Sequence, residues 1–179
     1  MAENAPTPPP GGAQPADAPQ AGAPAPRLTI LSQYIKDLSF ENPRAPGSLE
    51  PGKSRPEIQI RVDTRAQELG AERYEVTFQL HCEAKSGADP VFVVELTYAG
   101  LFSLSNVPQE SLQPVLLIEC PRLLFPFARR IVADVTRDGG FPPLMIDPID
   151  FVTLYRRRAE QAQPGAQPQP AGANGETTA

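Results

Sequence analysis

Apolar and polar residues alternate along much of the region between residues 27 and 105. The alternation is most regular over residues 74–84, where even-numbered positions are apolar or small and odd-numbered positions are polar. Successive side chains of a strand point to opposite faces, so this segment is predicted to be a long half-buried strand. The same pattern predicts a shorter strand over residues 57–63 and a less regular one over residues 28–41.

The run from residue 91 to residue 104 is apolar at both odd and even positions. In a sheet with one buried face, such a strand predicts a second cover, either a helix or another subunit. Residues 85–90 contain turn-forming residues and predict a hairpin loop. The proline-rich stretch 42–56 is too long for a tight turn, so it predicts a crossover between strands that need not be neighbours.

The hydrophobic period lengthens after residue 106. Residues 112–116 predict a short amphipathic helix, which Pro121 interrupts. A longer helix is predicted next, with Pro126 in its first turn and Gly139–Gly140 at its end. Its apolar stripe has helical spacing at Leu124, Phe127, Ile131 and Val135.

A last helix is predicted from residue 147 to about residue 159. Asp147 is expected as its N-cap, Pro148 as its first residue and Asp150 as its third, because acids and proline favour these positions. Four strands followed by helices predict an α+β fold with a four-stranded antiparallel sheet.

Proline and charge are distributed unevenly along the 179 residues. Residues 1–26 hold 8 of the 23 prolines and have no lysine, arginine or aromatic residue, and residues 161–179 have a similar composition. Neither segment carries enough apolar surface to offset the entropy of ordering, so both are predicted to be disordered tails. Residues 27–160 are predicted to form one domain with its own core.

Several classes of protein are excluded by composition. No run approaches the length of a membrane span, and no secretory signal precedes the predicted core. Cys82 and Cys120 are too few for a disulfide framework and are predicted to be buried thiols in a reducing compartment. A net charge of −5 argues against nucleic acid as the main partner. The expected location is the cytoplasm.

Residues that could carry catalysis or hold a metal are few. His81 and Cys82 are neighbours on a predicted strand, so they face opposite sides and cannot converge on one metal ion. A surface histidine beside a core cysteine is the better interpretation. Asp147 and Asp150 could be paired carboxylates, but their spacing around Pro148 favours a helix cap. The sequence therefore predicts no enzyme, no cofactor and no metal site.

Acidic residues on the predicted strands allow two interpretations. Alternation places Asp37 and Glu41 on one face of their strand, opposite Leu38 and Phe40, and places Glu95 on one face of another strand. A solvated sheet face is the ordinary interpretation, and a surface that binds a basic partner is the alternative.

Five sequence segments together resemble the SecB family of bacterial protein-export chaperones. The segments are YIKDLSFENPRAP from Tyr34, PEIQIRVDT from Pro56, GLFS from Gly100, CPRLLFPFAR from Cys120 and GFPP from Gly140. The resemblance implies a four-stranded antiparallel sheet with helices on one face, assembled as a dimer of dimers. It also implies a chaperone without ATP that holds unfolded precursor proteins and delivers them to the export motor SecA. The alternative is a homo-oligomeric scaffold or adaptor of the same fold that binds one folded partner.

The resemblance also implies roles for particular residues. The SecA contact maps onto Asp37, Glu41, Val93 and Glu95, and the positions that govern tetramer formation onto Val94, Leu96 and Tyr98. A client groove between the crossover and the long helix is expected on or near Phe40, Leu49, Phe125, Phe127 and Phe141. About half of these groove residues are expected to be ordinary core, because buried aromatic residues are usually structural. The crossover has Leu49 as its only large apolar residue where the family commonly carries aromatics, so its contact with clients is left open.

Overall fold

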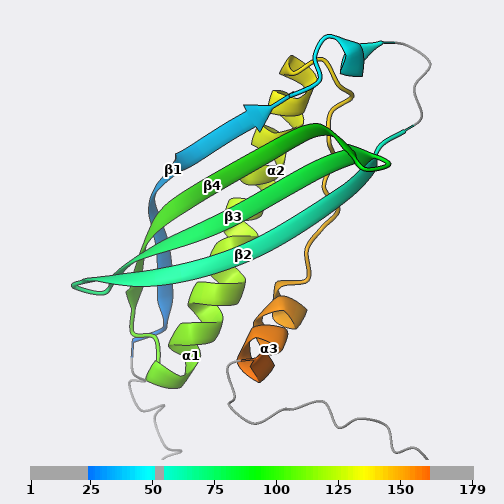
Figure 1. Ribbon diagram of the computed structural model, residues 1–179. Coiled ribbons are helices and arrows are strands. Elements are labelled where there is room, and N and C mark those ends of the chain that lie inside the picture. The colour runs from blue at the N-terminus through cyan, green and yellow to red at the C-terminus, as the bar shows by residue number, and fades with distance from the viewer. Residues whose placement is uncertain (1–23, 51–54, 162–179) are drawn as a thin grey trace, which may run out of the picture.

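The computed structural model describes residues 24–50 and 55–161 and shows one antiparallel sheet with helices on one face (Figure 1). The predicted tails, 1–26 and 161–179, lie almost wholly outside the described residues, as do residues 51–54 of the crossover. The strands are β1 (Arg27–Glu41), β2 (Glu57–Gly70), β3 (Arg73–Ser86) and β4 (Asp89–Ser105). The helices are α1 (Gln109–Pro114), α2 (Cys120–Asp138) and α3 (Phe151–Gln161). The predicted α+β class and four-stranded antiparallel sheet are confirmed.

The strands lie in the order β1-β4-β3-β2, and every neighbouring pair is antiparallel. The segment 42–56 joins β1 to β2, which form opposite edges of the sheet, so it is the predicted crossover between strands that are not neighbours. It contains a short 3₁₀ turn, η1 (Gly47–Leu49). We call the face of the sheet covered by the helices the inner face and the opposite one the outer face.

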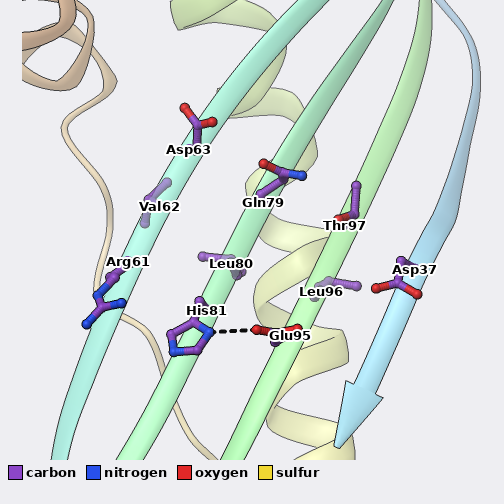
Figure 2. Close-up of a pocket in the computed structure, with 10 residues that line it drawn as sticks. All are labelled: Asp37, Arg61, Val62, Asp63, Gln79, Leu80, His81, Glu95, Leu96 and Thr97. Carbon is purple, nitrogen blue, oxygen red and sulfur yellow. Dashed lines mark hydrogen bonds and ion pairs between the residues drawn. The ribbon is translucent and has the colours of Figure 1, made fainter.

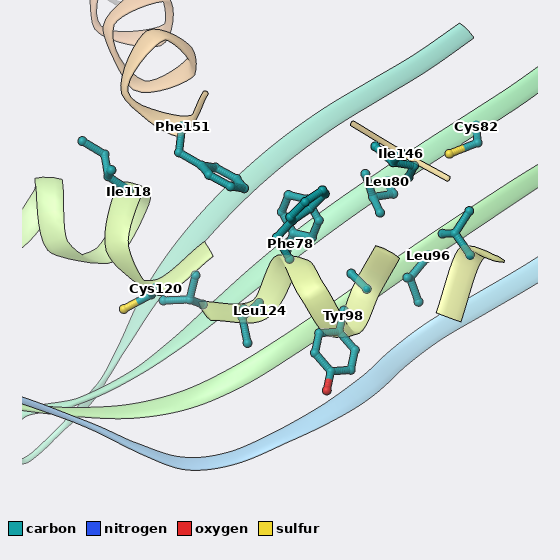
Figure 3. Packing of buried hydrophobic residues seen from close by; sticks show 14 of the residues in the cluster. Phe78, Leu80, Cys82, Leu96, Tyr98, Ile118, Cys120, Leu124, Ile146 and Phe151 are labelled. Atoms are coloured by element: carbon teal, nitrogen blue, oxygen red, sulfur yellow. The ribbon is translucent and has the colours of Figure 1, made fainter. Parts of the chain in front are cut away.

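The core lies between the inner face and α2 (Figure 3). The even-numbered residues of 74–84 are all buried, as the alternation predicts, and so are those of 92–98 on β4. Leu124, Ala128 and Val132 of α2 are fully buried against them. The edge-on ring contacts of Phe78 with Phe125 and Phe151, with centroids 6.1 and 5.7 Å away, connect the sheet to α2 and α3.

β2 is seven residues longer than the predicted strand, which ended at residue 63. Residues 65–70 are exposed and lack apolar alternation, so no burial pattern marks them. They are held instead by the backbone ladder with β3, which a two-residue turn at Ala71 and Glu72 closes with positive φ angles of 52° and 55°. The loop between β3 and β4 is likewise tighter than the predicted 85–90, since only residues 87 and 88 lie outside the strands.

The predicted break at Pro121 does not occur. Helical structure continues from α1 through a π-helical segment, η2 (Val115–Glu119), into α2. A proline ring clashes with the carbonyl four residues earlier in a regular α-helix, and the wider π turn lies where Pro121 would meet the carbonyl of Leu117. Pro126 lies inside α2 and not in its first turn, because α2 already begins at Cys120. Gly139 and Gly140 end α2 as predicted.

The predicted start of the last helix is wrong by three residues. Asp147 and Pro148 precede α3, which begins at Phe151. Asp150 is the capping residue, since its carboxylate accepts hydrogen bonds from the backbone N–H groups of Val152 and Thr153 at 3.0 and 3.1 Å. These bonds and the Thr153 hydroxyl hold the pKa of Asp150 below its usual value. An aspartate can cap a helix at either position, so the residue types alone did not show whether Asp147 or Asp150 is the cap.

A buried threonine connects the end of α2 to the segment that follows it. The Thr136 hydroxyl donates to the carbonyl of Val132 at 2.8 Å and accepts the backbone N–H of Leu144 at 2.9 Å. Ile146, farther along the same segment, is 3% exposed and belongs to the core. The segment between α2 and α3 is therefore packed against the domain through both polar and apolar contacts.

Candidate functional site: an apolar end and a charged face

Three of the five predicted groove residues lie together where α2 ends. Phe40 at the end of β1 and Phe141 after α2 both contact Phe92 of β4, with ring centroids 6.0 and 4.9 Å apart. A Cβ atom on Gly139 would lie 2.1 Å from the Phe40 ring, so this glycine allows the ring to lie against the helix end. The Leu49 side chain of the crossover lies against Gly140. We call Phe40, Leu49, Phe92 and Phe141 the apolar end.

A hollow of about 480 Å³ lies beside the apolar end, between the crossover and the segment after α2. Leu49 and Phe141 line it, and Leu49 is 44% exposed although it is a large apolar residue. Arg44 and Arg55 line it too, and Arg44 forms an ion pair with Asp89 of β4. Since Glu50 and Asp89 line it as well, the hollow combines an apolar wall with charged side chains of both signs, so it can accept an apolar side chain next to polar backbone.

The other two predicted groove residues lie elsewhere on α2. Phe125 is 8% exposed and packs against Phe78 and Phe151, so its side chain belongs to the core. Phe127 is 45% exposed, and its ring stacks on that of Tyr98 with centroids 6.4 Å apart. The structure therefore separates these two phenylalanines from the apolar end by most of the length of α2.

The four predicted SecA-contact residues lie together on the outer face. Glu41 is paired with Val93, and Glu95 lies in the next row of the sheet, opposite Ser39. Asp37 follows one row farther, opposite Thr97. Two bulges interrupt β1 before Asp37, yet the alternation from Asp37 to Glu41 is regular, so parity placed both carboxylates correctly.

Basic residues share this face with the acidic ones. The predicted surface position of His81 is confirmed, but sequence reasoning did not find which residues lie beside it. His81 of β3 lies between Glu95 of β4 and Arg61 of β2 in one row of the sheet. The His81 Nδ1 atom is 3.0 Å from Glu95 Oε1. Figure 2 shows these side chains around a hollow of about 400 Å³ that also includes Asp37 and Asp63, and we call it the outer hollow. Alternation places Arg61 and His81 on the outer face, but which residues lie beside them depends on strand register.

A second polar cluster lies on the outer face farther along the strands. Tyr34 donates its hydroxyl to Glu75 at 2.5 Å, and Lys36 donates to the same carboxylate at 2.7 Å. The hydrogen bond to Glu75 raises the pKa of Tyr34 to about 12, with burial as a smaller cause. Bonds from Lys36 and Tyr34 in turn lower the pKa of Glu75. The cluster connects β1 to β3 across β4.

Neither cysteine lies on a reactive surface. Cys82 and Cys120 are fully buried free thiols, as predicted. Burial raises the pKa of Cys82 to about 11 and that of Cys120 to about 12, so both are protonated thiols at neutral pH. Among residues 24–50 and 55–161, no group of three or more His, Cys, Asp or Glu side chains is arranged to hold a metal ion. No helix in the same ranges is long and apolar enough to cross a membrane.

The free edge of β2 is covered at one point by α3. Arg158 donates from its guanidinium to the backbone carbonyl of Thr64 and to the Asp63 carboxylate. Asp63 also accepts the backbone N–H of Thr64 at 2.9 Å. Both backbone groups of Thr64 therefore have side-chain partners. We call this arrangement the Arg158 contact.

Comparisons with known proteins decide the family. The family model for preprotein translocase subunit SecB matches residues 21–162. The protein-export protein SecB of a Bradyrhizobium species is 57% identical over 83% of this chain and 93% of its own length. That of Rhodopseudomonas palustris is 55% identical over 84% of this chain and 95% of its own, and that of Maricaulis maris 49% identical over 92% and 95%. The chain belongs to the SecB family.

Membership of the SecB family confirms the resemblance found in the sequence and makes the protein a protein-export chaperone. A solved structure of a SecB-like chaperone from Mycobacterium tuberculosis, in complex with a peptide from an antitoxin, has a similar fold. The TM-score is 0.58, with 69% of this chain and 91% of that chain covered and 19% of residues identical. At this identity the likeness shows the fold alone.

The SecB resemblance implied that Val94, Leu96 and Tyr98 govern tetramer formation. Their side chains are 0%, 2% and 7% exposed and lie in the core of one chain. A role in assembly would therefore act through the packing of the sheet against α2, since little of these side chains can touch another subunit. The role itself stays a prediction.

Exposed apolar side chains gather elsewhere, on β1 and on the adjoining flank of α2. They are between 37% and 48% exposed: Ile30, Ile35, Leu38, Leu123 and Phe127. Ile35 is paired with Tyr98, on which Phe127 stacks, so the two elements meet there. We call this surface the apolar flank. The apolar outer residues of β4, which led to the prediction of a second cover, are half-buried among their neighbours.

Proposed function

We propose that the protein binds unfolded precursor proteins, keeps them competent for translocation and delivers them to SecA. The observation that carries the client-binding part is the apolar end, with its hollow of about 480 Å³ and an exposed Leu49. An unfolded chain exposes apolar side chains and free backbone groups, and a hollow with an apolar wall and polar rim suits both. The peptide bound by the SecB-like chaperone of Mycobacterium tuberculosis is consistent with this activity. The chaperone acts in the cytoplasm without catalysis, cofactor or nucleotide.

Client binding can be tested with one protein in its native and denatured states. We expect the chaperone to suppress aggregation of several unrelated denatured proteins and to bind none of their native forms. Leu49→Asp should weaken binding of a denatured client, because it places a charge on the apolar wall. Leu69→Asp is the matched control, since Leu69 is equally exposed at 47% but lies at the far end of β2. Equal affinity for native and denatured forms would favour the adaptor alternative.

We propose a homotetramer, a dimer of dimers, as the working assembly. The apolar flank supports this proposal, because contiguous exposed apolar surface on a protein commonly marks an interaction site. Light scattering at micromolar concentration should give the mass of four chains. Ile35→Glu should reduce that mass, while Leu69→Glu, with a similar exposure, should leave it unchanged. A monomer for the unmodified chain would contradict the assembly.

SecA is proposed to bind the outer face through Asp37, Glu41, Val93 and Glu95. Three carboxylates around an apolar residue suit a partner with basic side chains, and such contacts should depend strongly on salt. A triple variant, Asp37→Asn with Glu41→Gln and Glu95→Gln, should associate with SecA more slowly than the unmodified chaperone. The difference in rate should be largest at low salt. Its affinity for a denatured client should stay unchanged, because the apolar end does not include these residues. A parallel loss of both affinities would contradict a separate SecA surface.

A further inference from the structure

The outer hollow has an acidic side and a basic side. Asp37 lies on β1 at one side, and Arg61 lies on β2 at the other (Figure 2). Two strands, β4 and β3, separate them. Since neighbouring strands lie about 4.8 Å apart, the three spacings from β1 to β2 total about 14 Å.

The two outermost charges of the hollow are available to a partner. Within residues 24–50 and 55–161, neither the Asp37 carboxylate nor the Arg61 guanidinium forms a hydrogen bond or an ion pair. Asp63 is on the same side as Arg61 but is already engaged by Arg65 at 3.0 Å and by Arg158 at 3.3 Å. It therefore leaves Arg61 as the free charge on the β2 side.

The middle of the hollow is occupied by the His81–Glu95 pair. A carboxylate can only accept, so His81 Nδ1 carries the proton in this 3.0 Å contact. Glu95 is held towards β3 by this bond, and the Glu95 side chain remains 57% exposed. Glu83 of β3, one row away on this face, pairs with Lys85 at 3.0 Å. Across the hollow, an unpaired carboxylate at Asp37 is therefore followed by the His81–Glu95 pair and then by an unpaired guanidinium at Arg61, among the described residues.

We propose that the outer hollow binds an extended segment of SecA that carries a basic residue and a carboxylate on the same side. The basic residue pairs with Asp37 and Glu95, and the carboxylate pairs with Arg61. An extended chain rises about 3.3 Å per residue, so a span of about 14 Å corresponds to residues about four positions apart. Arg61 is a specificity residue in this arrangement, because it fixes which end of the segment lies over β2. This inference rests on the SecA contact proposed above.

The effect of Arg61→Glu on SecA affinity distinguishes this arrangement from a purely acidic surface, because the two predict changes in opposite directions. If SecA is attracted only by negative charge, Arg61→Glu makes the face more acidic and should strengthen binding. If Arg61 binds a carboxylate, the same change places two negative charges together and should weaken binding. An exposed ion pair contributes little, so Arg61→Gln is expected to lower affinity about 2–5-fold, and the reversal to Glu more than that at low salt.

The experiment measures binding of full-length SecA from the same organism to Arg61→Gln, Arg61→Glu and the unmodified chaperone at two salt concentrations. Arg73→Glu is the matched control, because Arg73 is an exposed arginine of the same sheet. It lies eight residues along β3 from His81, which is about 26 Å. Thermal unfolding and client binding check that every variant is folded.

Weaker SecA binding by both Arg61 variants, with Arg73→Glu unchanged, would support the inference. Stronger or unchanged binding by Arg61→Glu would overturn it. The triple carboxylate-to-amide variant described above keeps the two proposals distinguishable. If that variant binds SecA normally while Arg61→Glu binds weakly, the acidic contact is wrong and the carboxylate site at Arg61 stands. If the triple variant is weak and Arg61→Glu is strong, the acidic contact stands and the carboxylate site is wrong.

Discussion

The two faces of the sheet are built from the same strands and differ in what determines their structure. On the inner face, residues such as Val76 and Val94 are fully buried against helices of the same chain. On the outer face, charged side chains pair across strands, as His81 does with Glu95, around shallow hollows. Burial on the inner face stabilises the domain, whereas exposed charge pairs contribute little to stability. The outer face is therefore free to vary its charges for binding while the inner face is constrained by packing.

The largest difference between the faces should appear when a charge is introduced on β4. Leu96→Asp places a carboxylate in the core, where Leu96 is 2% exposed, and an unpaired buried charge costs several kcal/mol. We expect the variant to lose cooperative thermal unfolding, so a change in its assembly would follow from unfolding. Thr97→Asn, one residue away on the outer face, should unfold normally. Normal unfolding of Leu96→Asp would contradict the inner-face assignment.

Removing a ring from the inner face should have the next largest effect. Phe78 is fully buried and contacts two other phenylalanines, so Phe78→Ala leaves a cavity and should lower the free energy of unfolding by about 3–5 kcal/mol. Gln79→Ala changes the adjacent outer-face residue and should stay within about 0.5 kcal/mol. Chemical denaturation of both variants measures the difference. Similar losses would show that the two faces are equally packed.

Removing a buried hydroxyl on the helix side of the sheet should lower the free energy of unfolding by a smaller amount. Thr136→Val keeps the shape but removes the acceptor of the Leu144 N–H, so the free energy of unfolding should fall by about 1–3 kcal/mol. Thr77→Val on the outer face removes only a 3.5 Å contact to the Arg65 carbonyl and should change it little. Hydrogen exchange at Leu144 should also become faster in the Thr136 variant. Unchanged exchange there would rule out the proposed bond.

The smallest effect should come from the Tyr34–Glu75 cluster, and it should depend on pH. The pKa of Tyr34 is about 12 in the folded chain against an ordinary value of 10.0, so the folded state holds the hydroxyl proton more tightly. The resulting stabilisation is complete below pH 10 and is lost as pH rises to about 12. Tyr34→Phe should flatten the fall in stability between these values, as measured by thermal unfolding. An unaltered pH profile would contradict the contact with Glu75.

Sequence reasoning succeeded where burial leaves a local pattern. The alternation over residues 74–84 gave both the strand and its buried face, and parity placed Asp37 and Glu41 together. It failed over residues 65–70, which are strand without burial, because only the ladder with β3 holds them. The neighbours of Arg61 were not predictable either, since they depend on the register of β2 against β3. Register is a long-range property that no short stretch of sequence states.

The Arg158 contact has a consequence for how clients can be held. An extended client could join a sheet edge by backbone hydrogen bonds, each contributing about 0.5–1.5 kcal/mol, and a long run of them would release slowly. At Thr64 the carbonyl already accepts from Arg158 and the N–H already donates to Asp63. Neither group is available to hydrogen-bond to a fifth strand beside β2. Growth of the sheet along β2 is thereby interrupted. In the client binding proposed above, a client at this edge would instead be held by side-chain contacts at the apolar end, which can be released one at a time.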